Sequence, residues 1–185
     1  MSSPPASFLA VGLVRRVSRR SQGGPGLGGR ALRVGVEAGL QVALLGAVLW
    51  ATGLPFVFPS LGPTAFALVT RSGTAPAREV LGGHLCGLAA GLLAYHALAP
   101  GLAITDAIGP LSAGGLRLAA SGALSVALTA GAMVRLRAVH GPACATTLIV
   151  ALGVLPGLRE AAVIVAAVAG MYGAHVASRG RRARG

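Results

Sequence analysis

Acidic residues are scarce in this chain, and lysine is absent. Only four of the 185 residues are Asp or Glu, and all sixteen basic residues are arginine. So few carboxylates leave no pair of acids at catalytic spacing, and no loop holds a nucleophile, base and acid together or a phosphate-binding motif. We therefore expect neither an enzyme nor a cofactor.

Cysteine is also rare, with Cys86 and Cys144 both lying inside apolar stretches. Their spacing does not suit a metal, so we expect packing residues and no metal site. The net charge of +12 would suit nucleic acid, but the arginines lie at segment ends and in the tails rather than among aromatic residues. We expect them to contact anionic lipid headgroups, and we expect no nucleic-acid partner.

What the chain does contain is apolar sequence. Hydrophobic residues make up 54% of it, mean hydropathy is +0.76, and there are 29 glycines, a composition that predicts an integral membrane protein. Residues 1–29 are expected to form a loose basic arm and residues 179–185 a basic tail, on either side of one transmembrane domain at 30–178. The apolar segments of that domain are 31–53, 56–70, 80–99, 116–134, 141–155 and 161–177.

Two of these segments are short. The second and fifth have about 15 residues, or about 22 Å as helix, against a hydrocarbon core of about 30 Å. They must contain extended backbone, re-enter the membrane or thin it.

The chain also repeats itself. Gly62-Pro63 recurs as Gly141-Pro142, and Arg78-Glu79 recurs as Arg159-Glu160 at nearly the same spacing along the chain. Short apolar segments interrupted by Gly and Pro at corresponding positions of two halves are typical of transporters and point to the binding site.

The repeats would cover residues 31–99 and 116–177, joined by a hinge at 100–115. Three crossings in each repeat would give the two repeats inverted topology. The predicted fold is thus an all-α polytopic membrane helix bundle of two inverted three-segment repeats.

The distribution of arginine favours six crossings over four. With six crossings and both termini in the cytoplasm, every arginine except Arg117 and Arg159 lies on the cytoplasmic side, whereas four crossings would leave five outside. We expect a bacterial inner-membrane protein of this topology.

Three stretches give the chain a specific resemblance. Residues 62–65 (Gly-Pro-Thr-Ala), 75–84 (Ala-Pro-Ala-Arg-Glu-Val-Leu-Gly-Gly-His) and 140–146 (His-Gly-Pro-Ala-Cys-Ala-Thr) resemble the HPP family of integral membrane proteins. The family is named for a His-Pro-Pro step, and Gly141 replaces its first proline here. Plant plastid members are described as nitrite transporters, so the resemblance implies transport of a small anion.

The Gly-Pro steps also suggest an anion site by themselves. Proline suits the first turn of a helix, and a helix start has unpaired amide donors and partial positive charge. We expect helices to start at both steps and to point toward a common centre. Ser60 and Thr64 near the first step, and Thr146 and Thr147 after the second, would add hydroxyl donors. The alternative is that the steps only kink packed helices and the hydroxyls bond their own backbone.

His84 and His140 are the candidate ionisable residues of the site. An ionisable side chain inside a membrane is a functional candidate, and a histidine could carry a symported proton; the alternative is a neutral imidazole bonded to a carbonyl. A glycine at every fourth position from Gly83 to Gly91 predicts a close-packing helix face. His96 and His175, near segment ends, are expected at the membrane interface.

The repeated Arg78-Glu79 and Arg159-Glu160 pairs have two interpretations. They would anchor helix ends, since an acid in the first turn suits the helix dipole and arginine reaches headgroups. Alternatively they form a gate or rim that draws anions inward.

We therefore predict a membrane transporter of a small monovalent inorganic anion, nitrite-like by resemblance, with or without a coupled proton. An anion channel and a non-transporting scaffold or sensor subunit are the alternatives. Monomer and homodimer both stay open.

Overall fold

The structure is a computed structural model that describes residues 27–182, and over this range its regular secondary structure is helical throughout. The all-α prediction is confirmed for these residues, whereas most of the predicted basic arm, at 1–26, lies outside them. The helices are α2 (Leu27–Thr52), α3 (Val57–Thr70), α4 (Ala77–Leu98), α5 (Ala113–Arg135), α6 (Ala143–Ala151) and α7 (Leu158–Arg182).

The chain divides into two compact units at residue 35. The described part of the first unit, residues 27–35, forms the beginning of α2. All contacts discussed below lie within the second unit, from residue 36 onward.

Four helices, α2, α4, α5 and α7, are long and apolar enough to cross a membrane. α3 has 14 residues and α6 has nine, which correspond to about 21 Å and about 14 Å. Both are shorter than the hydrocarbon core, as the sequence predicted for the second and fifth segments. Non-helical backbone flanks α6 on both sides.

One of the two predicted helix starts is wrong. α6 begins directly after Pro142, as expected, but Pro63 lies inside α3, which begins at Val57. A proline there removes only the bond from residue 63 to the carbonyl of Pro59, near the helix start. Membrane helices tolerate such a loss because neighbouring groups can satisfy the carbonyl.

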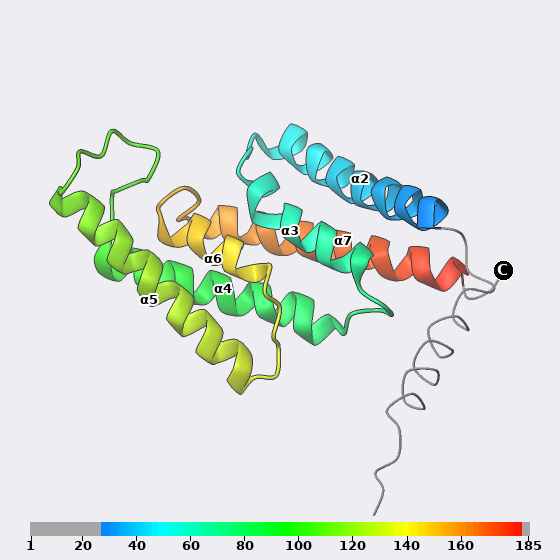
Figure 1. Cartoon of the computed structure of the whole chain (residues 1–185). Coiled ribbons are helices and arrows are strands. Elements are labelled where there is room, and N and C mark those ends of the chain that lie inside the picture. The colour runs from blue at the N-terminus through cyan, green and yellow to red at the C-terminus, as the bar shows by residue number, and fades with distance from the viewer. Residues whose placement is uncertain (1–26, 183–185) are drawn as a thin grey trace, which may run out of the picture. The chain divides into compact units, whose positions relative to one another are not determined.

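α4 is the central helix. Half of its most apolar stretch is buried inside the bundle, compared with 33% for α5 and 28% for α7. It packs most closely against α5 and α6, and Figure 1 shows these three helices together. The main apolar core lies where α3 and α7 meet, and includes Leu61, Leu68, Ile164 and Met171.

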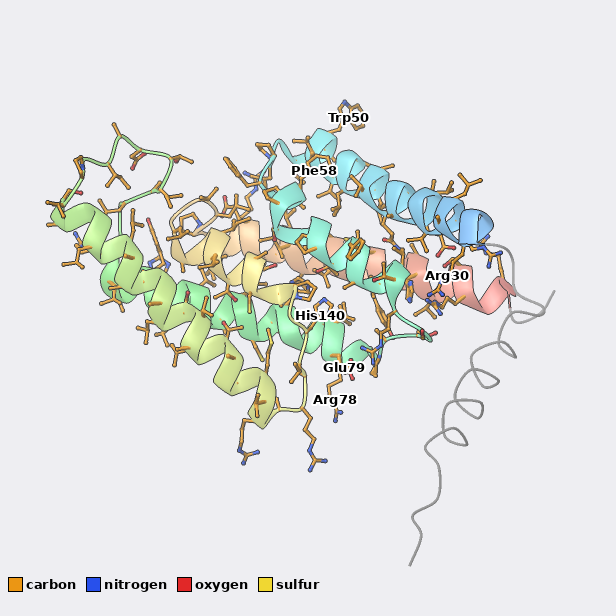
Figure 2. All side chains as sticks on the ribbon, viewed as in Figure 1. Arg30, Trp50, Phe58, Arg78, Glu79 and His140 are labelled. Carbon is orange, nitrogen blue, oxygen red and sulfur yellow. The ribbon has the colours of Figure 1, made fainter. Side chains whose placement is uncertain are left out.

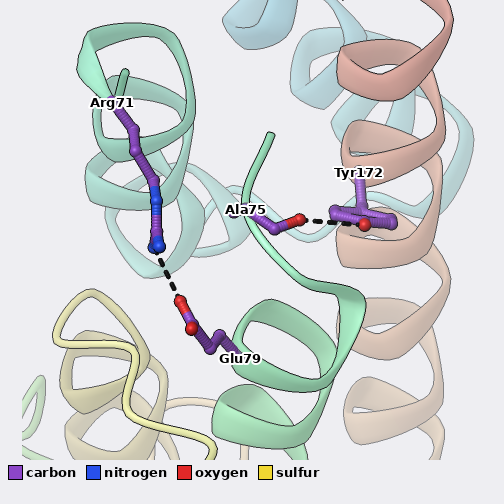
Figure 3. Close-up of polar contacts among 4 residues, drawn as sticks. All are labelled: Arg71, Ala75, Glu79 and Tyr172. Atoms are coloured by element: carbon purple, nitrogen blue, oxygen red, sulfur yellow. Dashed lines mark hydrogen bonds and ion pairs between the residues drawn. The ribbon is translucent and has the colours of Figure 1, made fainter. Parts of the chain in front are cut away.

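Most of the arginines in the second unit share one end of the bundle. Arg71 at the end of α3 pairs with Glu79 at the start of α4 (Figure 3). Arg179 of α7 donates to the carbonyl of Arg71. The loop between α5 and α6 lies against the first turns of α4. We call this the arginine-rich end; its arginines are Arg71, Arg78, Arg135, Arg137, Arg179 and Arg181.

The opposite end holds the predicted hinge. Arg117 donates to the carbonyl of Leu98 at the end of α4, and the Ile104 amide donates to the carbonyl of Leu152 after α6. The hinge therefore contacts the bundle near Ile104, while the side chains of residues 104–111 are exposed.

Candidate functional site

Five polar side chains meet in the middle of the bundle. They come from α3, α4, α6 and the loop before α6, and each is between 0 and 7% exposed. We call them the polar cluster: Ser60, Thr64, His84, His140 and Thr146. All five were candidate site residues from the sequence.

The polar cluster is a continuous hydrogen-bonded chain. Thr146 Oγ1 lies 3.0 Å from Ser60 Oγ and 2.9 Å from His84 Nδ1. On the other side of the ring, His84 Nε2 lies 2.9 Å from Thr64 Oγ1, which lies 3.4 Å from His140 Nε2. The two imidazole rings are 5.3 Å apart.

This chain can be satisfied in two directions. If His84 carries its hydrogen on Nε2, it donates to Thr64 and accepts from Thr146; if on Nδ1, both bonds reverse. In either direction, each hydrogen bond between Ser60 and His140 has one donor and one acceptor. Protonated His84 also fits, because it would donate to both threonines while their hydroxyls turn outward.

The glycines of α4 bring the polar cluster together. A methyl group added at Gly83 would come within 2.7 Å of His140 Cβ, and at Gly87 within 2.6 Å of Thr147 Oγ1. At Gly91 it would come within 2.9 Å of the Thr147 carbonyl oxygen. Only glycine permits this approach of α4 to α6 and the loop before it, so the predicted packing face is confirmed.

His140 connects the polar cluster to the arginine-rich end. Burial lowers the pKa of His140 below its usual value of 6.5; the carboxylate of Glu79 opposes this shift, and the guanidinium of Arg71 adds to it. Figure 2 shows His140 turned into the bundle and Arg78 pointing away from it. The imidazole is thus predominantly neutral at pH 7.

The two Gly-Pro steps do not form the helix starts with free amide donors that the sequence predicted beside the polar cluster. A methyl group at Gly62 or Gly141 would meet nothing within 4 Å, so neither glycine is required for a close approach. Pro63 is exposed inside α3. At the start of α6 the amides of residues 143–145 donate to the carbonyls of residues 140–142, Pro142 included. The prediction of unpaired amide donors at helix starts is therefore wrong at both steps.

The Arg-Glu pairs lie at opposite ends of the bundle. Glu79 bonds Arg71 at 2.6 Å, whereas Arg78 is exposed. Arg159 and Glu160 are in the first turn of α7, away from the arginine-rich end, and Arg159 is exposed. Their proposed role at a gate or rim stays a prediction.

Two polar contacts beside the polar cluster were missed at the sequence level. Thr129 Oγ1 of α5 lies 3.0 Å from Thr147 Oγ1, and Ser121 donates to the carbonyl of Ala151 at 2.7 Å. A signal was available, because Ser121, Ser125 and Thr129 recur every four residues on α5. His175, expected at the membrane interface, has a side chain that is only 1% exposed.

Comparison with known families decides the assignment. The family model described as "HPP, transmembrane region" matches residues 28–178. The chain belongs to the HPP family. In this HPP protein the match covers every described helix apart from the first residue of α2 and residues 179–182 at the end of α7. The bundle and its polar cluster therefore both lie inside the family region. Comparisons with curated proteins and with solved structures gave no match.

Proposed function

We propose that this HPP protein is a secondary carrier that moves a small monovalent anion, nitrite or one of similar size, together with a proton. Its family and its four apolar helices make it an integral membrane protein. The observation that carries the transport proposal is the polar cluster: two imidazoles and three hydroxyls, shielded from solvent between apolar helices. Ionisable groups in this setting are costly and typically functional.

The chemistry of the polar cluster suits an anion that arrives with a proton. Its members are hydroxyl and imidazole groups, which can all donate hydrogen bonds to an oxyanion. A protonated His84 alone would be strongly disfavoured in a low-dielectric setting, and so would an anion alone. Bound together they are neutral, so protonation and anion binding should strengthen each other.

The described arrangement corresponds to a closed state, because every member of the polar cluster is buried. Transport then requires states that open the polar cluster to each side in turn. The short helices α3 and α6 are the natural moving parts, since each carries polar-cluster residues and neither spans the membrane alone.

Inverted repeats would supply these alternating states, and two features support them. Exchanging α2 with α5, α3 with α6 and α4 with α7 turns the α4–α6 contact into the α3–α7 contact, and both are present. The correspondence is partial, because α2 packs far less closely on α7 than α5 packs on α4. The same exchange turns the groove between α4 and α5 into the groove between α2 and α7, which is also present.

These two grooves agree in register as well. Leu85 and Ala89 of α4 line one groove, and Ala166 and Gly170 of α7 line the other. The spacing along the chain from Leu85 to Ala166, and from Ala89 to Gly170, equals the spacing between the two Arg-Glu pairs. Because positive charge gathers at the arginine-rich end, we infer that this end lies in the cytoplasm, together with both termini.

Uptake into proteoliposomes tests the proposal. We expect saturable nitrite uptake that a proton gradient, acidic outside, accelerates, and we expect His84→Ala to reduce the proton-linked flux at least tenfold, by loss of the proton carrier. His96→Ala is the matched control, because His96 is exposed on the same helix. Equal pH dependence in wild type and His84→Ala would rule out the role of His84.

A scaffold or sensor subunit is the second candidate, and one observation favours it. The members of the polar cluster bond one another end to end, as expected of a structural polar core. If purified protein moves neither nitrite nor other small anions under any gradient, the scaffold replaces the carrier. Non-saturating conductance would instead indicate a channel.

A further inference from the structure

The two ends of the polar cluster differ in chemistry and in access to the surface. At one end Ser60 bonds Thr146, whose hydroxyl can also donate to the Ser60 carbonyl at 3.4 Å. At the other end is His140, in the loop before α6, and its neighbours Val139 and Gly141 are exposed. His140 therefore lies between the buried centre and the surface of the arginine-rich end.

Thr64 connects the two imidazole rings. Its hydroxyl oxygen lies 2.9 Å from His84 Nε2 and 3.4 Å from His140 Nε2. A hydroxyl both accepts and donates hydrogen bonds, so it can receive a proton from one ring while it passes its own to the other. This requires a neutral His140 with its hydrogen on Nδ1, which leaves Nε2 as the acceptor.

The hydroxyl groups between α5 and α6 do not offer a comparable route. Ser121, Ser125 and Thr147 can each donate to a backbone carbonyl. A backbone carbonyl accepts a hydrogen bond but does not take up the proton at neutral pH. The titratable ring that lies against His84 is that of His140, 5.3 Å away on the arginine-rich side.

We propose that His140 is the proton relay between His84 and the arginine-rich end, and that it acts through the Thr64 hydroxyl. This inference rests on the proton-coupled carrier proposed above. Protonated His84 gives its Nε2 proton to Thr64 Oγ1 as the Thr64 hydroxyl proton moves to His140 Nε2. His140 then releases its Nδ1 proton to water, and exchange with water restores the first tautomer. His84 ends neutral, and Thr64 and His140 end as they began.

The ion pair of Arg71 and Glu79 influences how readily His140 takes the proton. The carboxylate of Glu79 raises the pKa of His140, and the guanidinium of Arg71 lowers it. The charged and titratable groups that act on His140 are these two and His84. Since Arg71 and Glu79 bond each other at 2.6 Å, replacing either one breaks the same contact between α3 and α4 (Figure 3). The two replacements nevertheless change the pKa of His140 in opposite directions.

The full chain in proteoliposomes tests the relay through two fluxes. One is net nitrite uptake driven by a proton gradient, and the other is exchange of isotopically labelled nitrite at equal pH on both sides. Net uptake needs the proton to leave the protein, whereas exchange does not. We expect His140→Gln and Thr64→Val to lower the ratio of net uptake to exchange by about tenfold or more. Continued exchange shows that each variant is folded.

Two matched variants serve as controls for this ratio. Thr64→Ser keeps the hydroxyl and should restore the wild-type ratio. His96→Gln replaces an exposed histidine of α4 and should also leave the ratio unchanged.

The ion pair gives a second readout, which a purely structural role would not produce. In Glu79→Gln, the pH at which net uptake falls to half its maximum should move by about 0.5 unit toward acid, because His140 takes the proton less readily. In Arg71→Gln it should move by about the same amount toward alkali. Loss of the ion pair as a structural contact would move both variants in the same direction.

Several results would overturn the relay. They are a wild-type ratio in both His140→Gln and Thr64→Val, pH shifts of the same sign in the two ion-pair variants, and a Thr64→Ser ratio as low as that of Thr64→Val. Nitrite uptake by the wild type without proton movement would overturn the relay and leave an uncoupled carrier. Absence of any nitrite flux in the wild type would reject the carrier itself, and the relay with it.

Discussion

Two histidines and three hydroxyl residues, rather than charged side chains, form the polar centre of this membrane bundle. His84 is held at both ring nitrogens, by Thr64 and Thr146, so its orientation is set by two different helices. This arrangement holds an ionisable imidazole in a defined orientation without placing a permanent charge inside the bundle. At the residue scale the predictions therefore concern single hydroxyl and imidazole groups.

Removing the Thr146 hydroxyl should destabilise the bundle. Thr146→Val leaves His84 Nδ1 and the Ser60 hydroxyl without this partner, at a cost of about 1–3 kcal/mol. Thr70→Val is the control, because Thr70 is exposed and bonds only the backbone of its own helix; its effect should stay within about 0.5 kcal/mol. Unfolding by denaturant in detergent measures both. Equal losses would show that the Thr146 hydrogen bonds add no stability.

The lowered pKa of His140 should make stability depend on pH. Since its pKa is below 6.5 in the folded state, the unfolded chain binds the proton more readily, and stability present above pH 6.5 is lost as the pH falls. Groups that face His140 include Thr64 and His84 as well as Glu79 and Arg71. We expect the melting temperature to fall between pH 7.5 and pH 5, and to fall less in His140→Gln. The same slope in both proteins would contradict this.

At the scale of elements, the close approach of α4 to α6 decides the architecture. Ordinary side chains would hold two helices about 8–10 Å apart. The glycines of α4 allow the backbone of α6 to come nearer, as the Gly87 position beside the carbonyl of Ala143 illustrates. The nine-residue α6 depends on this contact, since so short a helix has little stability alone.

Gly87→Ala should therefore be costly. The new methyl group would lie 2.6 Å from Thr147 Oγ1 and 3.0 Å from the Ala143 carbonyl oxygen, so α6 must shift at a cost of about 1–3 kcal/mol. Gly131→Ala on α5 is the control, because nothing lies within 4 Å of its added methyl group. Thermal unfolding in detergent compares the two. If Gly87→Ala is as stable as Gly131→Ala, the packing face tolerates side chains.

At the scale of the whole molecule, the separation of arginines between the two ends is the main evidence for orientation. Among residues 36–181, one end carries six arginines and the other carries Arg117 and Arg159. Positive charge accumulates on the cytoplasmic side of short loops. The short helix α6 is the critical element, because it decides whether its two flanking loops lie on opposite sides.

Labelling of single cysteines tests that topology. In a background of Cys86→Ala and Cys144→Ala, Val139→Cys before α6 and Leu158→Cys after it are both exposed, at 59% and 79% for the native side chains. We expect an impermeant thiol reagent to label Val139→Cys in inside-out vesicles, which expose the cytoplasmic side. The same reagent should label Leu158→Cys in right-side-out vesicles. Labelling of both from the same side would mean that α6 turns back.

Much of this protein is determined by its sequence alone. Composition and hydropathy determine that it is a membrane protein of apolar helices, because the hydrocarbon solvent acts on each segment separately. The two short segments, the packing glycines of α4 and the family were likewise predictable. So were the five members of the polar cluster, since intramembrane polar residues are few and conspicuous.

Only the tertiary structure decided which of these groups meet. Thr146 of α6 bonds His84 of α4, and Glu79 bonds Arg71 rather than its neighbour Arg78, because helix crossings and not sequence spacing bring side chains together. The position of Pro63 inside α3 could not be foreseen, since a proline suits either a helix start or a tolerated interior site. Hydrophobicity is a property of each segment, whereas a hydrogen-bond partner is a property of the packing.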